Sequence, residues 1–186
     1  MLLNVVTLGT TYFRYAGTSI PETEIIYHII SSIFGSVEEE KIAANDGPIH
    51  TIIEIRFPVL YGDDFFTLFG ADRWFKLRNV ITEIKKRRGK GQMRIVFGFP
   101  GVSGASDTAT RLVLQTSETD YRNIERAIDR VQVLVETIGS QMSKMPPEVF
   151  EMTYCYEAAH SRWRPDFVKT TKRIYKYSND VWKSST

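Results

Sequence analysis

Short segments in which apolar and polar residues alternate strictly place the tightest constraint on the fold of this chain. In 150–157 every second residue is aromatic or Met, and the residues between them are Glu, Thr, Cys and Glu. Segments 49–57 and 93–99 alternate in a similar way. A period of two is the signature of a strand with one buried face. The chain is therefore expected to form a sheet with one apolar and one polar face.

Other segments carry apolar residues at helical spacing, which predicts helices over 20–34, 72–88 and 120–139. The first is preceded by Ser and opens with Ile-Pro-Glu, which is typical of a capping box with proline in the first turn. The segment 166–182 is interpreted as a helix that begins after Pro165. A strand is the alternative there, because its Thr and Tyr residues favour extended structure.

The expected fold is a single α+β domain over residues 1–186, because this length fits one domain. Strands are also expected over 2–15 and around 112–114. A single-layer mixed or antiparallel sheet with helices on one face buries the apolar stripes most simply. Without its second helix the order is β-α-β-β-α-β, which is the ferredoxin-like arrangement, here with an inserted helix and a C-terminal helix. The basic segment 160–186 is expected to pack on this domain or extend from it.

Composition excludes several classes of protein. Apolar residues make up 42% and charged residues 25%, as in ordinary globular proteins. A single cysteine, Cys155, excludes an intramolecular disulfide and any metal site built from several cysteines. No apolar run reaches the roughly 18 residues that span a bilayer, and residues 1–15 do not resemble a signal peptide. We expect a cytoplasmic protein with no membrane partner, and no motif predicts a cofactor.

Positive charge is concentrated in two segments, although the net charge is only +2. Residues 71–90 hold eight Lys and Arg against two Asp and Glu, and residues 160–186 hold seven against two. Uneven charge of this kind attracts anionic partners over long range. Aromatic residues interleave with the cations of the second segment, and this combination suits single-stranded nucleic acid.

The leading hypothesis from these segments is a non-catalytic binding protein for nucleic acid or another polyanion. Its predicted contact residues are Lys85, Lys86, Arg87, Arg88, Lys90, Arg94, Arg56, Arg111, Arg162, Arg164, Lys172 and Arg173. The runner-up is a homo-oligomer with a structural or regulatory role.

The polar face of the sheet collects three of these arginines. Arg56, Arg94 and Arg111 come from three strands at outward positions, and Glu54 and Glu151 are expected on the same face. Three interpretations stay open: a solvated face with cross-strand ion pairs, an anion site, and the contact surface of a homodimer.

Three other features suggest chemistry less specifically. Tyr-Gly-Asp-Asp at 61–64 resembles the metal-binding hairpin of palm-type polymerases over about five residues, which implies metal-dependent phosphoryl or nucleotidyl transfer at Asp63 and Asp64. Such a site needs a further carboxylate, from Asp46 or Glu54, and the same sequence is also ordinary turn chemistry.

The glycine-rich segment 98–106 is interpreted as a hairpin connection, with a phosphate loop as the alternative. Cys155 could act as a nucleophile only with His50 as its base, since no other histidine is expected on that face.

Overall fold

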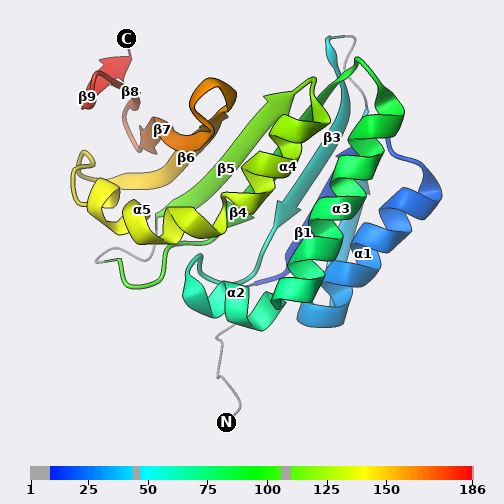
Figure 1. Ribbon diagram of the computed structural model, residues 1–186. Coiled ribbons are helices and arrows are strands. Elements are labelled where there is room, and N and C mark those ends of the chain that lie inside the picture. Colours follow the sequence, from blue (N-terminus) through cyan, green and yellow to red (C-terminus); the bar gives the residue numbers. More distant parts are fainter. Residues whose placement is uncertain (1–8, 44–46, 106–109, 186) are drawn as a thin grey trace.

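The computed structural model describes residues 9–43, 47–105 and 110–185, in which nine strands form one mixed sheet (Figure 1). Helices cover one face of this sheet. The strands are β1 (Thr11–Ala16), β2 (Val37–Lys41), β3 (Ile49–Arg56), β4 (Gln92–Phe99), β5 (Arg111–Glu118), β6 (Val149–Glu157), β7 (Arg162–Thr170), β8 (Ile174–Ser178) and β9 (Val181–Ser185). The helices are α1 (Ile20–Phe34), α2 (Asp63–Phe69), α3 (Ala71–Arg88), α4 (Tyr121–Asp129) and α5 (Val135–Met142), with short 3₁₀ turns η1 (Gln132–Leu134) and η2 (Ala158–His160).

Three β-α-β units follow one another in the sheet, whose order is β2-β1-β3-β4-β5-β6-β7-β8-β9. In each unit the two strands are parallel and pair directly: β1 with β2, β3 with β4, and β5 with β6. Neighbouring units meet through antiparallel pairs, and β6 to β9 form an antiparallel meander. The predicted α+β class is confirmed. The ferredoxin-like arrangement is not, because that fold splits its β-α-β units.

Helix α1 begins with the predicted capping box. The backbone N–H of Ser19 donates to the carboxylate of Glu22 at 2.8 Å. Glu22 is 5% exposed and also receives Arg88 at 2.6 Å and Arg87 at 3.4 Å, both from the end of α3. Burial by itself would raise the pKa of Glu22, but the hydrogen bonds from Ser19 and the two guanidinium groups outweigh it and hold that pKa below its usual value. Glu22 therefore links α1 to α3.

Most predicted elements are found where the periodicity placed them. Strands β3, β4 and β6 match the three alternating segments, and α3 buries Trp74, Leu77, Ile81 and Ile84 as expected. The predicted strand over 2–15 is observed from Thr11 onward as β1, while its first residues lie outside the described part of the chain.

The predicted C-terminal helix is wrong. Residues 162–185 form β7, β8 and β9, so the strand alternative for this segment is the correct one. Asn179 and Asp180 both have positive φ, at 51° and 58°, and they form the two-residue turn between β8 and β9. Positive φ at both central residues is typical of a type I′ turn, whose twist matches that of the two strands it connects.

The predicted long helix over 120–139 is interrupted after Asp129 and resumes at Val135. At the interruption the backbone carbonyl of Val131 accepts a hydrogen bond from the hydroxyl of Tyr61, which is completely buried. This carbonyl also accepts from the backbone N–H of Leu134 at 3.3 Å, so at the break it serves both a tight turn and the buried phenol.

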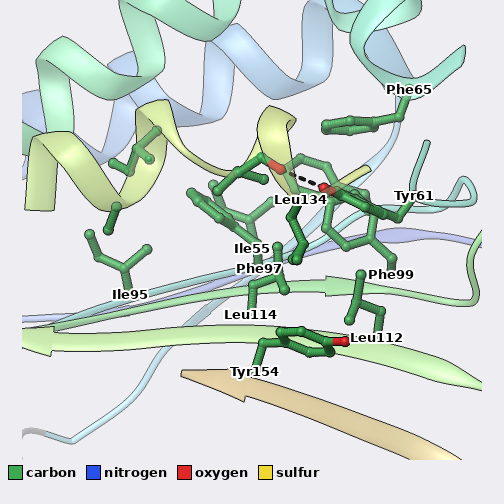
Figure 2. Packing of buried hydrophobic residues seen from close by; sticks show 14 of the residues in the cluster. Ile55, Tyr61, Phe65, Ile95, Phe97, Phe99, Leu112, Leu114, Leu134 and Tyr154 are labelled. Atoms are coloured by element: carbon green, nitrogen blue, oxygen red, sulfur yellow. Dashed lines mark hydrogen bonds between the residues drawn. The ribbon is translucent and has the colours of Figure 1, made fainter. Parts of the chain in front are cut away.

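The core lies between the sheet and the helices and is rich in aromatic rings. Figure 2 shows Tyr61, Phe65 and Leu134 packed over Phe97 and Leu114 of the sheet. The ring of Phe65 lies 4.8 to 5.9 Å, between centroids, from those of Phe57, Phe66, Phe69, Trp74 and Phe99. Every helix in the described ranges is too short or too polar to cross a membrane.

Candidate functional site on the open sheet face

The face of the sheet that points away from the helices carries a cavity of about 560 Å³. In β4 the core residues Met93, Ile95 and Phe97 alternate with Arg94 and Val96, which line this cavity. The same alternation turns Glu54 and Arg56 of β3, Arg111 and Gln115 of β5, and Glu151 of β6 to this side. We call this side the open face, because the helices of the described chain lie on the other one (Figure 1).

One row of residues crosses the open face perpendicular to the strands. Cross-strand pairing joins each member to the next, with one residue from β1 and one from each of β3 to β9. This transverse row consists of Tyr12, Arg56, Gly98, Val113, Thr153, Phe167, Lys176 and Lys183. Its first six members line the cavity.

The cavity holds two arginines that have no carboxylate partner among the described residues. Arg94 donates to the side-chain oxygen of Gln115 at 3.0 Å, which leaves its charge unbalanced. Arg111 is exposed and forms no ion pair within the described residues. Both therefore present guanidinium groups that are free to bind an anion.

The other two cations of the cavity are paired. Arg56 lies 2.6 Å from Glu54, and Lys169 lies 2.6 Å from Glu151. The charged lining of the cavity is thus four cations, from these two residues and the two unpaired arginines, against two carboxylates. The cavity has an excess of two positive charges, so the site favours an anion.

Cys155 lies on the open face beside Gln115, which donates to its sulfur at 3.3 Å, and its thiol donates to Asp166 at 3.2 Å. Burial, the largest cause, together with Asp166 raises the pKa of the Cys155 thiol to about 11. His50 lies on β3, three strands away, which is at least about 14 Å. His50 is therefore too far away to act as the base, and the raised pKa keeps the Cys155 thiol protonated at neutral pH.

We expect Cys155 in the folded protein to react with iodoacetamide about 100-fold more slowly at pH 8 than a free thiol, because only the thiolate is nucleophilic. Its reactivity should increase as the pH approaches 11. Mass spectrometry of the folded and urea-unfolded protein measures both rates. Equal rates in the two states at pH 8 would show that the thiol is neither buried nor hydrogen-bonded.

The basic segment at the end of α3 lies in the helical layer, on the other side of the sheet from the arginines of the cavity. Lys85 is buried, and its ammonium group donates to the carbonyl of Gly89. The ion pairs of this segment are Lys86 with Glu83, and Arg87 and Arg88 with Glu22. The pairs with Glu22 join α3 to α1, whereas the contacts of Lys85 and Lys86 lie within α3 and its C-terminal cap. Lys90 is exposed and forms no ion pair within the described residues.

The predicted C-terminal contact residues are also divided. Arg162 and Arg164 both pair with Glu157. Lys172 lies 4.0 Å from Glu148, and Arg173 is exposed in the turn between β7 and β8. The structure therefore brings Arg56, Arg94 and Arg111 together, but it places the other nine predicted contact residues outside their cavity.

The Gly-Asp-Asp segment begins a short helix. Asp63 and Asp64 occupy the first turn of α2, whereas Glu54 lies on the open face, and Asp46 is outside the described residues. Within residues 9–43, 47–105 and 110–185, no three His, Cys, Asp or Glu side chains are grouped so that they could hold a metal ion.

The glycine-rich segment differs in part from the hairpin connection that was expected, because Gly98 belongs to β4 and forms part of the cavity floor. Past Gly98 the chain leads to β5, and Ser106 lies outside the described residues.

Several members of the site were not found from the sequence. Tyr12 lies two residues before Arg14, so in a strand both side chains point to the same face. This spacing could have identified Tyr12 as a member of the site. Phe167 and Lys176 lie within the helix predicted over 166–182, and Lys183 lies just beyond it, so that interpretation does not reveal their alignment across three strands. Comparisons with protein families, with curated proteins and with solved structures find no match to this chain, so its function has to be inferred from the open face itself.

Proposed function

We propose that the open face binds a ligand that carries phosphate or carboxylate groups, and that Arg94 and Arg111 hold it. The observation that carries the proposal is the pair of guanidinium groups in one cavity without carboxylate partners among the described residues. A guanidinium group offers a planar set of donors that matches two oxygens of a carboxylate or phosphate.

The contrast with the paired cations supports this assignment. Arg56 and Lys169 already have carboxylates at 2.6 Å, so their charge is balanced within the protein. Ion pairs whose cation is partly exposed, as in these two, need no function to explain them. Two unbalanced cations in a concave site repel each other, and a bound anion removes that repulsion. The cavity volume of about 560 Å³ lies in the range of small-molecule sites.

The proposal is one of binding without catalysis. Cys155 lies on the same face as the arginines, but the pKa of its thiol is raised to about 11, and the thiol donates a hydrogen bond to Asp166. Self-association and metal chemistry at Asp63 and Asp64 remain predictions from the sequence, because no described contact favours either.

Thermal melts with inorganic pyrophosphate test the proposal. At ten times the dissociation constant, binding should raise the melting temperature by roughly 3–6 °C. Replacing both Arg94→Ala and Arg111→Ala should abolish this rise. The melting temperature without ligand should change little, because neither side chain forms an ion pair within the described residues.

Arg173→Ala is the matched control, since Arg173 is exposed and lies outside the cavity. This variant should keep the full response to pyrophosphate. A response that survives in the double variant would place the anion elsewhere. A wild-type protein that shows no response to pyrophosphate or to citrate would refute the proposal.

A further inference from the structure

Positive charge on the open face continues beyond the cavity along the transverse row. Lys176 of β8 pairs with Phe167 of β7, and Lys183 of β9 pairs with Lys176. Both lysines are exposed, and neither forms an ion pair within the described chain. Cross-strand neighbours on one face lie within about 5.5 Å, and like charges at that distance destabilise a sheet. Two unbalanced cations side by side therefore indicate a surface that meets negative charge.

The row has an aromatic side chain on each side of its middle section. Tyr12, from β1, is 40% exposed and lines the cavity. Phe167, from β7, is half-buried, and the ammonium of Lys169 lies 5.6 Å from the centre of its ring. Of the other aromatic residues of the C-terminal segment, Trp163 belongs to the core, Tyr175 and Trp182 pack against it, and Tyr177 packs on Trp182. These two rings are therefore placed where a flat ligand group could stack.

Between the two rings the row runs through Arg56, Gly98, Val113 and Thr153. Arg56 lies next to Tyr12 and is paired with Glu54, and the three small side chains that follow it form the floor of a groove. A side chain at Gly98 would crowd Arg56, because an added Cβ would lie 3.2 Å from its Cγ. Neighbouring strands are about 4.8 Å apart, so the row is about 34 Å long from β1 to β9.

Long polar side chains border this floor. On one side of the row, Glu151 is the cross-strand partner of both Arg111 and Lys169. Arg111 and Lys169 each lie two residues along their strand from the row member, which is the next position that faces outward. Gln115, which receives the hydrogen bond from Arg94, lies one outward position to the other side. The amide nitrogen of Gln115 donates to Cys155, so an extended ligand in the row would have cationic donors along the first border and would meet Arg94 beyond the second.

We infer that the transverse row binds single-stranded nucleic acid, laid across the strands with bases stacked on Tyr12 and Phe167. This inference rests on the proposed anion site and adds the ligand class. Arg94, Arg111, Lys176 and Lys183 contact phosphates over a length that suits several nucleotides, as in other single-strand binding domains. A duplex fits this surface poorly, because its bases are stacked on each other and leave no free faces for the two rings.

Fluorescence polarisation with labelled oligodeoxythymidine and oligouridine tests the inference. Affinity should increase through lengths of about 4, 8 and 12 nucleotides as the probe reaches more of the row. Lys176→Glu with Lys183→Glu should weaken binding of the longest probe at least tenfold. The slope of log affinity against log salt should become shallower by about 2, one for each lost phosphate contact. Tyr12→Ala should weaken binding roughly tenfold through lost stacking.

Lys90→Glu with Lys144→Glu is the matched control. It makes the same change in net charge at two exposed lysines outside the cavity, and it should cost less than threefold. An equal loss in this control would mean that binding follows net charge, or uses the α3 segment, and would overturn the inference. Inorganic polyphosphate that binds as tightly as the oligonucleotides, with no effect of Tyr12→Ala, would overturn base stacking.

The pyrophosphate melts separate this inference from the proposed function. The lysine double variant should keep the pyrophosphate response, because Lys176 and Lys183 lie outside the cavity. A response to pyrophosphate without oligonucleotide binding would refute single-stranded nucleic acid as the ligand and leave the anion site intact. If the protein neither responded to pyrophosphate nor bound oligonucleotides, both the proposed anion site and the inferred nucleic-acid ligand would be refuted.

Discussion

Replacing Phe65 with alanine is expected to lower the free energy of unfolding by about 3–5 kcal/mol. Phe65 is completely buried, and its ring contacts five other aromatic rings from α2, α3, β4 and the segment after β3. Removal of the ring leaves a cavity among rigid neighbours that cannot collapse into it. Urea unfolding followed by circular dichroism measures the change.

Phe150→Ala is the control for that experiment, because Phe150 is 40% exposed at the start of β6. It should change the free energy of unfolding by less than about 1 kcal/mol. Phe65→Ala should also keep the pyrophosphate response while folded, because the ring lies on the helix side of the sheet. If the two phenylalanine variants were equally stable, the aromatic cluster would not be the core described above.

The link between α1 and α3 predicts a loss of stability in acid. Glu22→Gln is expected to cost about 1–3 kcal/mol at neutral pH, because Arg88 and the N-terminus of α1 lose a charged partner that is nearly buried. The folded-state pKa of Glu22 lies below its unfolded value. Its contribution is therefore fully present above the unfolded pKa of about 4.3 and is lost as the pH falls through the lower folded value.

Urea unfolding of wild type and Glu22→Gln at a series of pH values measures this contribution. The two stabilities should converge at low pH, where the wild-type carboxyl is also neutral. Glu83→Gln removes an exposed carboxylate from Lys86 on the same helix and should have little effect. A gap between wild type and Glu22→Gln that stayed constant with pH would show that charge is not the source of the stabilisation.

The spacing of apolar residues predicted those helices and strands that bury one face along their whole length. Ile53 and Ile55 of β3 and the stripe of α3 are buried because their period matches the geometry of the element. Strand β2 was not predicted because its sequence is Val-Glu-Glu-Glu-Lys, with no apolar alternation. Its glutamates are held by long-range contacts instead: Glu40 by Arg14 and Glu39 by the Tyr15 hydroxyl. No local pattern in the sequence reveals such partners.

The sequence predicted which residues of each strand face the candidate site, but not which residues of neighbouring strands lie opposite each other. Alternation placed Arg56, Arg94 and Arg111 on one face, but the assignment of partners depends on how the strands align. Glu54 pairs with Arg56 and Arg14, while Arg94 and Arg111 lack carboxylates within the described residues. The charge count of 85–90 predicted a binding surface there. Arg87 and Arg88 instead pair with Glu22, which depends on where α1 lies, while Lys85 and Lys86 bond within α3 and its C-terminal cap.

The order of the strands has a consequence for how the protein is made. From β4 onward, every strand pairs with the strand that comes immediately before it in the chain. A nascent chain leaving the ribosome can therefore add strands one at a time to a single growing edge, since domains fold from their N-terminal side during synthesis. An intermediate that ended within β6 would carry both unpaired arginines but lack Phe167, Lys176 and Lys183. If the open face binds as proposed, such an intermediate would hold a single phosphate group before it could hold a polymer, and the length of ligand it accepts would increase only as the last strands are translated.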